Sequence, residues 1–298
     1  MKYFLKLFIP GVLVLSVLTS GCSISRVEFD QEAMNGMKKV AVILFTVPPS
    51  INYRDDPKEP GGKSLIQAVS EAATANNGPR AASVAQKSFI DNINKKGIAL
   101  KLMTQEEMMS NQKFVAVAKE AYDKIQAEKA KAKAELEKSS VGKALSMLSA
   151  FSAATGDNHG TEGAGPEGLP NYGLPSVWKS AESARTNMPG EKEYIMQAMQ
   201  ALGADGALII NDPGMSFSCD ACIGGTGSGS TGSAFLVTLV NAKGESILEM
   251  RQWFLVSSGD AAMLAYAVNP LQHEGLFIGH GEKMARVFVD YYKEEGGK

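Results

Sequence analysis

The chain has 298 residues, of which 44% are hydrophobic and 21% charged, and its formal net charge is −2 at pH 7. This composition is typical of a folded globular body. Beyond the N-terminal region no apolar run reaches the length of a membrane span, which excludes a polytopic membrane protein. Since there is no basic excess, no positive face for polyphosphate is predicted, and we do not expect nucleic acid as a partner.

The N-terminal 21 residues predict a signal peptide. Two lysines precede an apolar run from Leu7 to Leu18 that is too short to span a bilayer. The run closes in Leu18-Thr19-Ser20-Gly21-Cys22, which resembles the cleavage box of bacterial lipoproteins. The resemblance implies that 1–21 are removed and that Cys22 is acylated. Ser23 at the next position implies sorting to the outer membrane.

The first half of the chain predicts alternating strands and helices. We expect 22–36 to act as an acylated tether and 37–298 to form a single domain. The continuous apolar run from Val40 to Phe45 predicts a strand buried on both faces. A helix is expected from Pro79 to Lys96 and a second short strand from Ile98 to Met103. Thr104 and Glu107 then match a capping box that opens another helix.

Residues 104–188 differ in composition and are predicted to be an insertion. Lys119 to Lys138 is rich in Ala, Lys and Glu, which indicates a solvated helix. A second amphipathic segment after it completes an expected helical hairpin, with its apolar residues at Val141, Leu145, Leu148 and Phe151. This hairpin either projects to contact a partner or neighbouring copies, or folds back on the main sheet. From Thr155 to Pro175, Gly, Pro, Asn and Glu indicate a mobile loop.

The C-terminal part predicts most of a sheet. A helix is expected from near Pro189 to Gly203, followed by a strand from Ala207 to Asn211 and a loop from Asp212 to Ser233. An antiparallel hairpin should follow, with strands Phe235 to Val240 and Ser246 to Val256. The last helix presents Met284, Val287, Phe288 and Tyr291 to the sheet. The predicted fold class is therefore α+β, with a mixed sheet covered by helices on one side and flexible Gly-rich loops.

Three pieces of this pattern carry a family resemblance. The segments 38–45 and 202–210, together with strand 237–240 and the turn and strand 244–248, resemble periplasmic lipoproteins built on the domain seen at the N-terminus of TolB and in the curli-secretion lipoprotein. The resemblance implies a non-enzymatic role in assembling envelope structures. The insertion 104–188 and the segment 219–232 depart from it, so a pore-forming role is not carried over.

Cys219-Asp220-Ala221-Cys222 is the one constellation that suggests chemistry. Two thiols three residues apart can form a disulfide, exchange with another disulfide, or supply half of a metal site. A disulfide is the favoured interpretation, because an exported chain meets an oxidising compartment and the following Gly-rich segment does not open a helix. So small a loop would contribute only about 2 kcal/mol.

No metal site or cofactor is predicted. The histidines are His159, His273 and His280, and the last two lack the four-residue spacing of a zinc-protease helix, so surface or loop positions are expected. The segment Gly227 to Gly232 matches G-x-G-x-x-G. It runs directly into a predicted strand instead of opening a helix, so nucleotide binding is rejected.

The sequence thus favours a non-enzymatic, membrane-anchored envelope lipoprotein. It would act as an assembly, secretion-accessory or partner-binding factor at the outer membrane, facing the periplasm, and would contact a protein partner or copies of itself. The alternative is a periplasmic thiol, disulfide or metal handler that uses Cys219 and Cys222. An enzyme of cell-wall or polysaccharide chemistry ranks third, since no carboxylate pair in a recognisable setting can be named.

Overall fold

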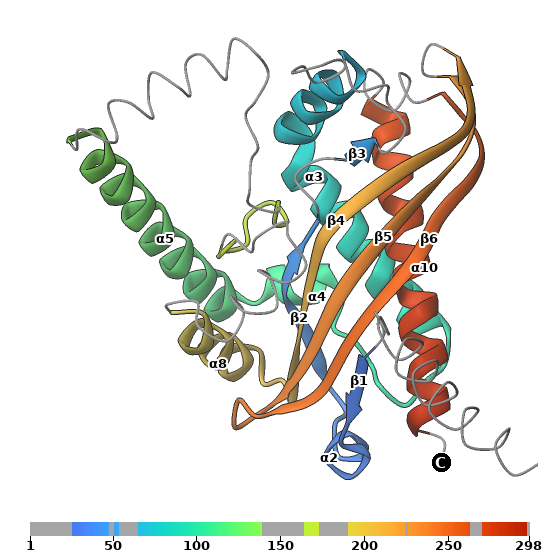
Figure 1. The fold of residues 1–298 in the computed structure, drawn as a ribbon. Helices are drawn as coiled ribbons and strands as arrows, with labels where there is room; N and C mark the ends of the chain where they lie inside the picture. Colours follow the sequence, from blue (N-terminus) through green and yellow to red (C-terminus); the bar gives the residue numbers. More distant parts are fainter. Residues whose placement is uncertain are drawn as a thin grey trace, which may run out of the picture.

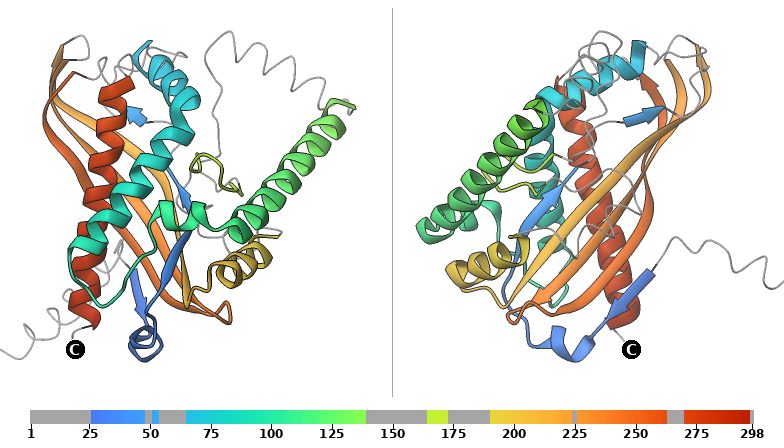
Figure 2. Two further views of the ribbon diagram at one scale, coloured as in Figure 1. Left: turned by 180° about the vertical axis from the view of Figure 1, so that it is seen from behind. Right: turned by 60° about the vertical axis from the view of Figure 1, so that its left-hand side comes forward.

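The computed structural model describes residues 26–47, 51–53, 65–138, 164–172, 190–223, 226–262 and 270–296. They form an α+β fold around a six-stranded mixed sheet of order β1-β6-β5-β4-β2, with β3 paired to β4 (Figure 1). Seen from behind, helices α3 and α10 lie across one face of this sheet (Figure 2). The predicted fold class is confirmed. Within the described residues, no helix combines the length and the apolar character needed to cross a membrane.

The sheet consists of a long antiparallel meander with parallel strands added at one edge. The meander is β4 (Gly206–Ile223), β5 (Thr226–Asn241) and β6 (Ser246–Ala262), while β2 (Val40–Thr46) and β3 (Ile51–Tyr53) run parallel to β4. The predicted hairpin turn between β5 and β6 is confirmed, and Gly244 adopts φ +77° in it. At the other edge β1 (Arg26–Phe29) pairs antiparallel with β6. The expected tether thus includes an ordered strand.

The loop predicted from Asp212 to Ser233 is wrong. β4 continues to Ile223 and β5 already begins at Thr226, so the Gly- and Ser-rich segment is a strand. Gly229 pairs with Cys219 on one side and with Gly259 on the other. Because β5 is hydrogen-bonded along both edges, pairing with its neighbours outweighs the weak strand propensity of Gly and Ser.

β2 is the buried strand that its apolar run predicted, since all of its seven residues are buried. Phe45 packs against Phe89 of the covering helix α3, with ring centroids 6.4 Å apart. The open edge of β2 is closed by polar groups: Gln86 Nε2 donates to the Val42 carbonyl at 3.0 Å. The strand predicted from Ile98 to Met103 is wrong, because only Leu102 forms a single bridge to Val40 there.

The described helices are α2 (Gln31–Asn35), α3 (Leu65–Lys95), α4 (Gln105–Ser110), α5 (Gln112–Lys138), α8 (Glu191–Leu202) and α10 (Pro270–Gly296). The predicted capping box of Thr104 and Glu107 opens α4, and Gly203 ends α8 in the left-handed region at φ +59°. The predicted start at Pro79 is wrong, since α3 begins at Leu65 and contains the proline. Pro79 is exposed, so water can satisfy the carbonyl that lacks an amide donor.

α3 and α10 pack closely against each other over the sheet. The ring of Phe89 meets that of Phe288 edge-on at 5.9 Å. At Gly281 the two helix backbones are so close that an added Cβ atom would lie 2.2 Å from the Ala85 carbonyl oxygen. The predicted inner face of α10 is confirmed: Met284 and Phe288 are fully buried, and Val287 and Tyr291 are half-buried against the core.

α5 leaves this body and extends away from it alongside α8 (Figure 1). The predicted solvated helix is confirmed where its side chains are described: the charged residues among these are exposed, while a thin apolar stripe is buried, formed by Phe114, Ala118 and Ile125. The second amphipathic segment, 141–151, lies outside the described residues. The predicted mobile loop is wrong over 164–172, where Ala164 and Val47 exchange backbone hydrogen bonds of 2.9 and 3.0 Å and Leu169 is buried.

Candidate functional site

The cysteines lie at the limit of what the structure describes. Cys22 falls outside the described residues, and Cys219 and Cys222 are placed by their backbone in β4, near its end. Cα atoms three residues apart in a regular strand are about 10 Å apart, while a disulfide needs less than about 7 Å. The β4–β5 register shifts between Cys219 and Ala221. A disulfide would require the strand to contract there, and it stays a prediction.

One predicted surface or loop histidine is instead fully buried. His280 lies on α10, and its Nε2 is 2.5 Å from the Asp212 carboxylate on β4. The same carboxylate oxygen accepts a hydrogen bond from Ser233 of β5 at 2.7 Å. His273 also lies within α10, and His159 is outside the described residues. The prediction for His280 was wrong because α10 already starts at Pro270 and therefore includes this residue. His280 occupies a position of α10 that faces the sheet.

This buried cluster has the residue types of a catalytic triad, but their spatial arrangement differs. It consists of Asp212, Ser233 and His280. In a triad the imidazole stands between the hydroxyl and the carboxylate and takes the proton of the hydroxyl. Here the carboxylate stands between the other two groups, and all three are buried. The cluster therefore joins α10 to the sheet. Among the described residues, no three His, Cys, Asp or Glu side chains gather as metal ligands.

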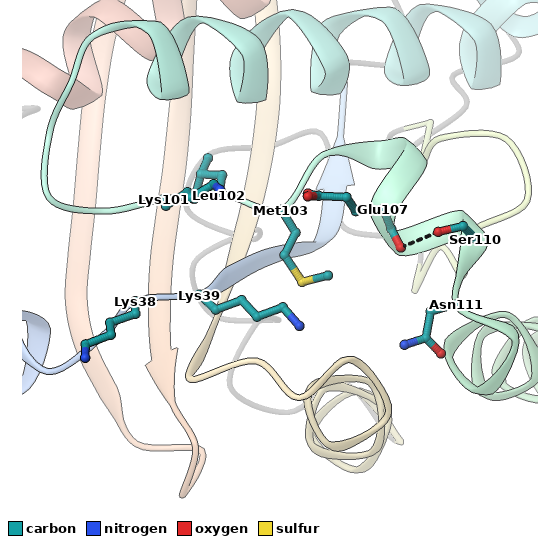
Figure 3. A pocket seen from close by; sticks show the side chains of 8 residues that line it. All are labelled: Lys38, Lys39, Lys101, Leu102, Met103, Glu107, Ser110 and Asn111. Atoms are coloured by element: carbon teal, nitrogen blue, oxygen red, sulfur yellow. Dashed lines mark hydrogen bonds between the residues drawn. The ribbon is translucent and has the colours of Figure 1, made fainter.

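A hollow of about 600 Å³ opens beside the start of β2 (Figure 3). Its lining includes three lysines and the first residues of the α4 region: Lys38, Lys39, Lys101, Leu102, Met103, Glu107, Ser110 and Asn111. Lys39 and Asn111 point toward each other across it, whereas Lys38 points away (Figure 3). The number of lysines at first suggests an anion site.

The hydrogen bonds of the lysine-lined hollow instead indicate a structural joint. Lys39 Nζ donates to the Leu202 carbonyl at 2.6 Å, and Asn111 Nδ2 donates to the Ala201 carbonyl at 3.0 Å. Both carbonyls belong to the last turn of α8, where the helix dipole favours a cation. The Lys39 ammonium is therefore already hydrogen-bonded to the C-terminal end of α8, and the helix dipole partly neutralises its charge there.

A second hollow, of about 270 Å³, lies between α5 and α8. Both helices line it, together with the 164–172 segment: Glu120, Ala121, Lys124, Ile125, Glu128, Tyr172, Gly190, Glu193, Tyr194 and Gln197. We name it the α5–α8 hollow. It lies where α8 packs beside the part of α5 that is nearest the body (Figure 1).

Two tyrosines form the inner part of the α5–α8 hollow. The rings of Tyr172 and Tyr194 have centroids 5.9 Å apart, and the Tyr172 hydroxyl donates to the Gly190 carbonyl at 3.2 Å. Tyr194 is 2% exposed, and its hydroxyl has no hydrogen-bond partner among the described residues. Burial raises the pKa of both phenols above the usual value, so both stay protonated at neutral pH.

The rim of the α5–α8 hollow carries an excess of negative charge. Glu120, Glu128 and Glu193 face one cation, Lys124, which lies 2.8 Å from Glu120. The hydrogen bond to Glu120, its charge and that of Glu193 raise the pKa of Lys124. Glu128 forms no ion pair or hydrogen bond with the residues that the structure describes. The hollow can thus offer an unused carboxylate and an unused hydroxyl.

The sequence did not reveal this hollow. Tyr194 stands four residues before Ala198 on α8, so it extends the apolar stripe of that helix by one position, and Glu120, Lys124 and Glu128 repeat at helical spacing. No sequence signal brings Tyr172 to the same place. Comparisons with protein families, curated proteins and solved structures find no significant match.

Proposed function

We propose that the chain is a non-enzymatic lipoprotein of the bacterial envelope that is anchored in the outer membrane through acyl chains on Cys22 and docks a protein partner on the periplasmic side. The N-terminal lipoprotein box supports the anchor. Cys22 precedes the first residue of β1, Arg26, by four positions, a reach of at most about 14 Å. Acylation would therefore hold the β1 and β6 edge of the sheet close to the membrane.

The observation that carries the docking role is the outer face of α5. Val115 and Tyr122 are seven residues apart and therefore share one face of the helix, and their side chains are 36% and 43% exposed. An exposed tyrosine two turns from an exposed aliphatic residue on the same helix face is the kind of surface that anchors protein interfaces. The polar remainder of α5 keeps this surface soluble when no partner is bound.

Capture of partners from detergent-solubilised envelopes tests the docking role. The lipidated protein with Val115→Ser and Tyr122→Ser should lose a partner that the unchanged protein retains. The matched control is Ile278→Ser, because Ile278 is 45% exposed on the opposite part of the molecule, on α10. Equal capture by both variants, with thermal midpoints unchanged, would contradict docking through α5.

Lipid labelling tests the anchor separately. Cys22→Ala should abolish palmitate incorporation and move the protein from the membrane fraction to the soluble fraction. Continued labelling would contradict the anchor. A Cys219→Ser and Cys222→Ser variant that folds and still captures the partner would count against the thiol or metal alternative.

A further inference from the structure

We propose that the α5–α8 hollow is a binding site for an organic cation that carries N–H donors, namely an ammonium or guanidinium group. This inference stands apart from the proposed anchor and docking role, because it concerns a small site that purified protein can reveal without membrane or partner. It rests on three independent features of the hollow: an unused buried hydroxyl, an unused carboxylate and a pair of aromatic rings.

The unused hydroxyl is the first feature. Burying a hydroxyl without a hydrogen bond is destabilising, and folded proteins rarely leave one in that state. Tyr194 is 2% exposed, lines the hollow, and has no partner for its hydroxyl among the described residues. A phenol oxygen can accept a hydrogen bond, so a ligand with N–H donors that displaces the side chains covering this oxygen would satisfy it.

The charge of the hollow decides the sign of the ligand. Three carboxylates, from Glu120, Glu128 and Glu193, stand against the single ammonium of Lys124. Glu120 already holds Lys124, and Gln197 donates to Glu193 at 3.2 Å, whereas Glu128 has no such contact with described residues. A cation near Glu128 would therefore gain an ion pair that none of the described side chains makes.

The rings and the size of the hollow decide the kind of cation. The faces of aromatic rings attract ammonium and guanidinium groups, and Arg in particular stacks on them. Ala121 and Ile125 provide an apolar wall for an alkyl stem. The volume, about 270 Å³, is just below the range of about 300–1,000 Å³ typical for drug-sized ligands. A group the size of a lysine or arginine side chain fits this description.

The first experiment is a titration of the purified full chain in detergent, followed by NMR or calorimetry. The probes are n-butylguanidinium, n-butylammonium and the neutral isostere N-butylurea. The two cations should bind and the urea should not. A capped Gly-Arg-Gly tripeptide distinguishes a polypeptide source, if it binds more tightly than n-butylguanidinium, from a free small amine, if it binds more weakly. Equal binding of the urea, or tighter binding of Ca²⁺ than of either cation, would overturn the proposal.

Three variants locate the binding. Glu128→Gln should weaken the binding of n-butylguanidinium about threefold, as expected for a partly exposed charge pair. Lys124→Gln should strengthen it, because a competing cation is removed. Tyr194→Phe should weaken it without lowering the thermal midpoint, since the lost hydroxyl has no partner among the described residues of the free protein.

Glu282→Gln is the matched control, because Glu282 is an exposed helical glutamate on α10, outside the hollow. It should leave the affinity unchanged. The proposal fails if Glu128→Gln and Lys124→Gln both match this control. These two exposed positions keep the test decisive even if Tyr194→Phe does not fold. Equal partner capture by the Val115→Ser and Tyr122→Ser variant and by its Ile278→Ser control, with intact cation binding, would refute the docking role alone.

Discussion

The body and the α5–α8 region are held together by different interactions. In the body, β2, α3 and α10 bury large side chains completely, including Phe45, Phe89 and Phe288. In the α5–α8 region a narrow apolar stripe is buried, the described charged residues of α5 are exposed, and a buried hydroxyl is left without a described partner. The body therefore depends on buried area, whereas the α5–α8 region leaves polar groups available for a ligand.

The largest difference between the two regions should appear on removing an aromatic ring. Phe89 is fully buried between Phe45 and Phe288, so Phe89→Ala should lower the free energy of unfolding by about 3–5 kcal/mol. Tyr122→Ala on α5 is the control, and its 43% exposed side chain predicts a loss of about 0.5 kcal/mol or less. Urea unfolding measures both. Similar losses would show that α5 is as deeply integrated as the body.

A second test concerns the close crossing of α3 and α10. Gly281→Ala would place a Cβ atom 2.2 Å from the Ala85 carbonyl oxygen and should lower the stability by about 1–3 kcal/mol. Gly279 lies on the same helix, and a Cβ atom added to it would meet nothing within 4 Å, so Gly279→Ala should be neutral or stabilise by up to about 1 kcal/mol. A milder effect at Gly281 than at Gly279 would mean that the helices cross less closely.

The spacing of apolar residues in the sequence predicted the body well, because the residues at the predicted inward positions are the ones that the structure buries. The run from Val40 to Phe45 became the buried strand β2, and Met284 and Phe288 became the inner face of α10. The failure at 212–233 has the opposite cause. Gly and Ser carry little local preference for a strand, and the hydrogen-bonded pairing with β4 on one side and β6 on the other orders them.

The α5–α8 hollow was beyond sequence reasoning for a related reason. Tyr172 and Tyr194 are 22 positions apart and come from different elements, and the angle at which α5 leaves the body brings Glu128 to the same place. Neither helix pattern encodes that angle. Asn111, the residue before α5, donates a hydrogen bond to the Ala201 carbonyl and so ties the start of α5 to the end of α8.

The third effect on stability is smaller and concerns the start of α4, the helix that connects the body to α5. The Thr104 hydroxyl accepts a hydrogen bond from the Glu107 amide at 3.1 Å, and this cap opens α4, which leads into α5. Thr104→Ala should cost about 1 kcal/mol, and Thr104→Ser, which keeps the hydroxyl, much less. Hydrogen exchange should report the loss first in α4. Faster exchange confined to α3 and α10 would place the cap in the body instead.

The smallest expected effect is a pH dependence of the stability that arises from Glu107, the other residue of the α4 capping box. A hydrogen bond of 2.7 Å from the Thr104 amide lowers the pKa of the Glu107 carboxyl below its usual value. A folded-state pKa below the unfolded one means that the ionised carboxylate stabilises the fold above the unfolded pKa of about 4.3. That contribution is lost as the pH falls through the folded pKa. The stability difference between the unchanged protein and Glu107→Ala should therefore be larger at pH 7 than at pH 3. Because the carboxyl is exposed, salt should reduce the difference at pH 7. A difference that grows on acidification would mean that the protonated acid makes the stabilising contact.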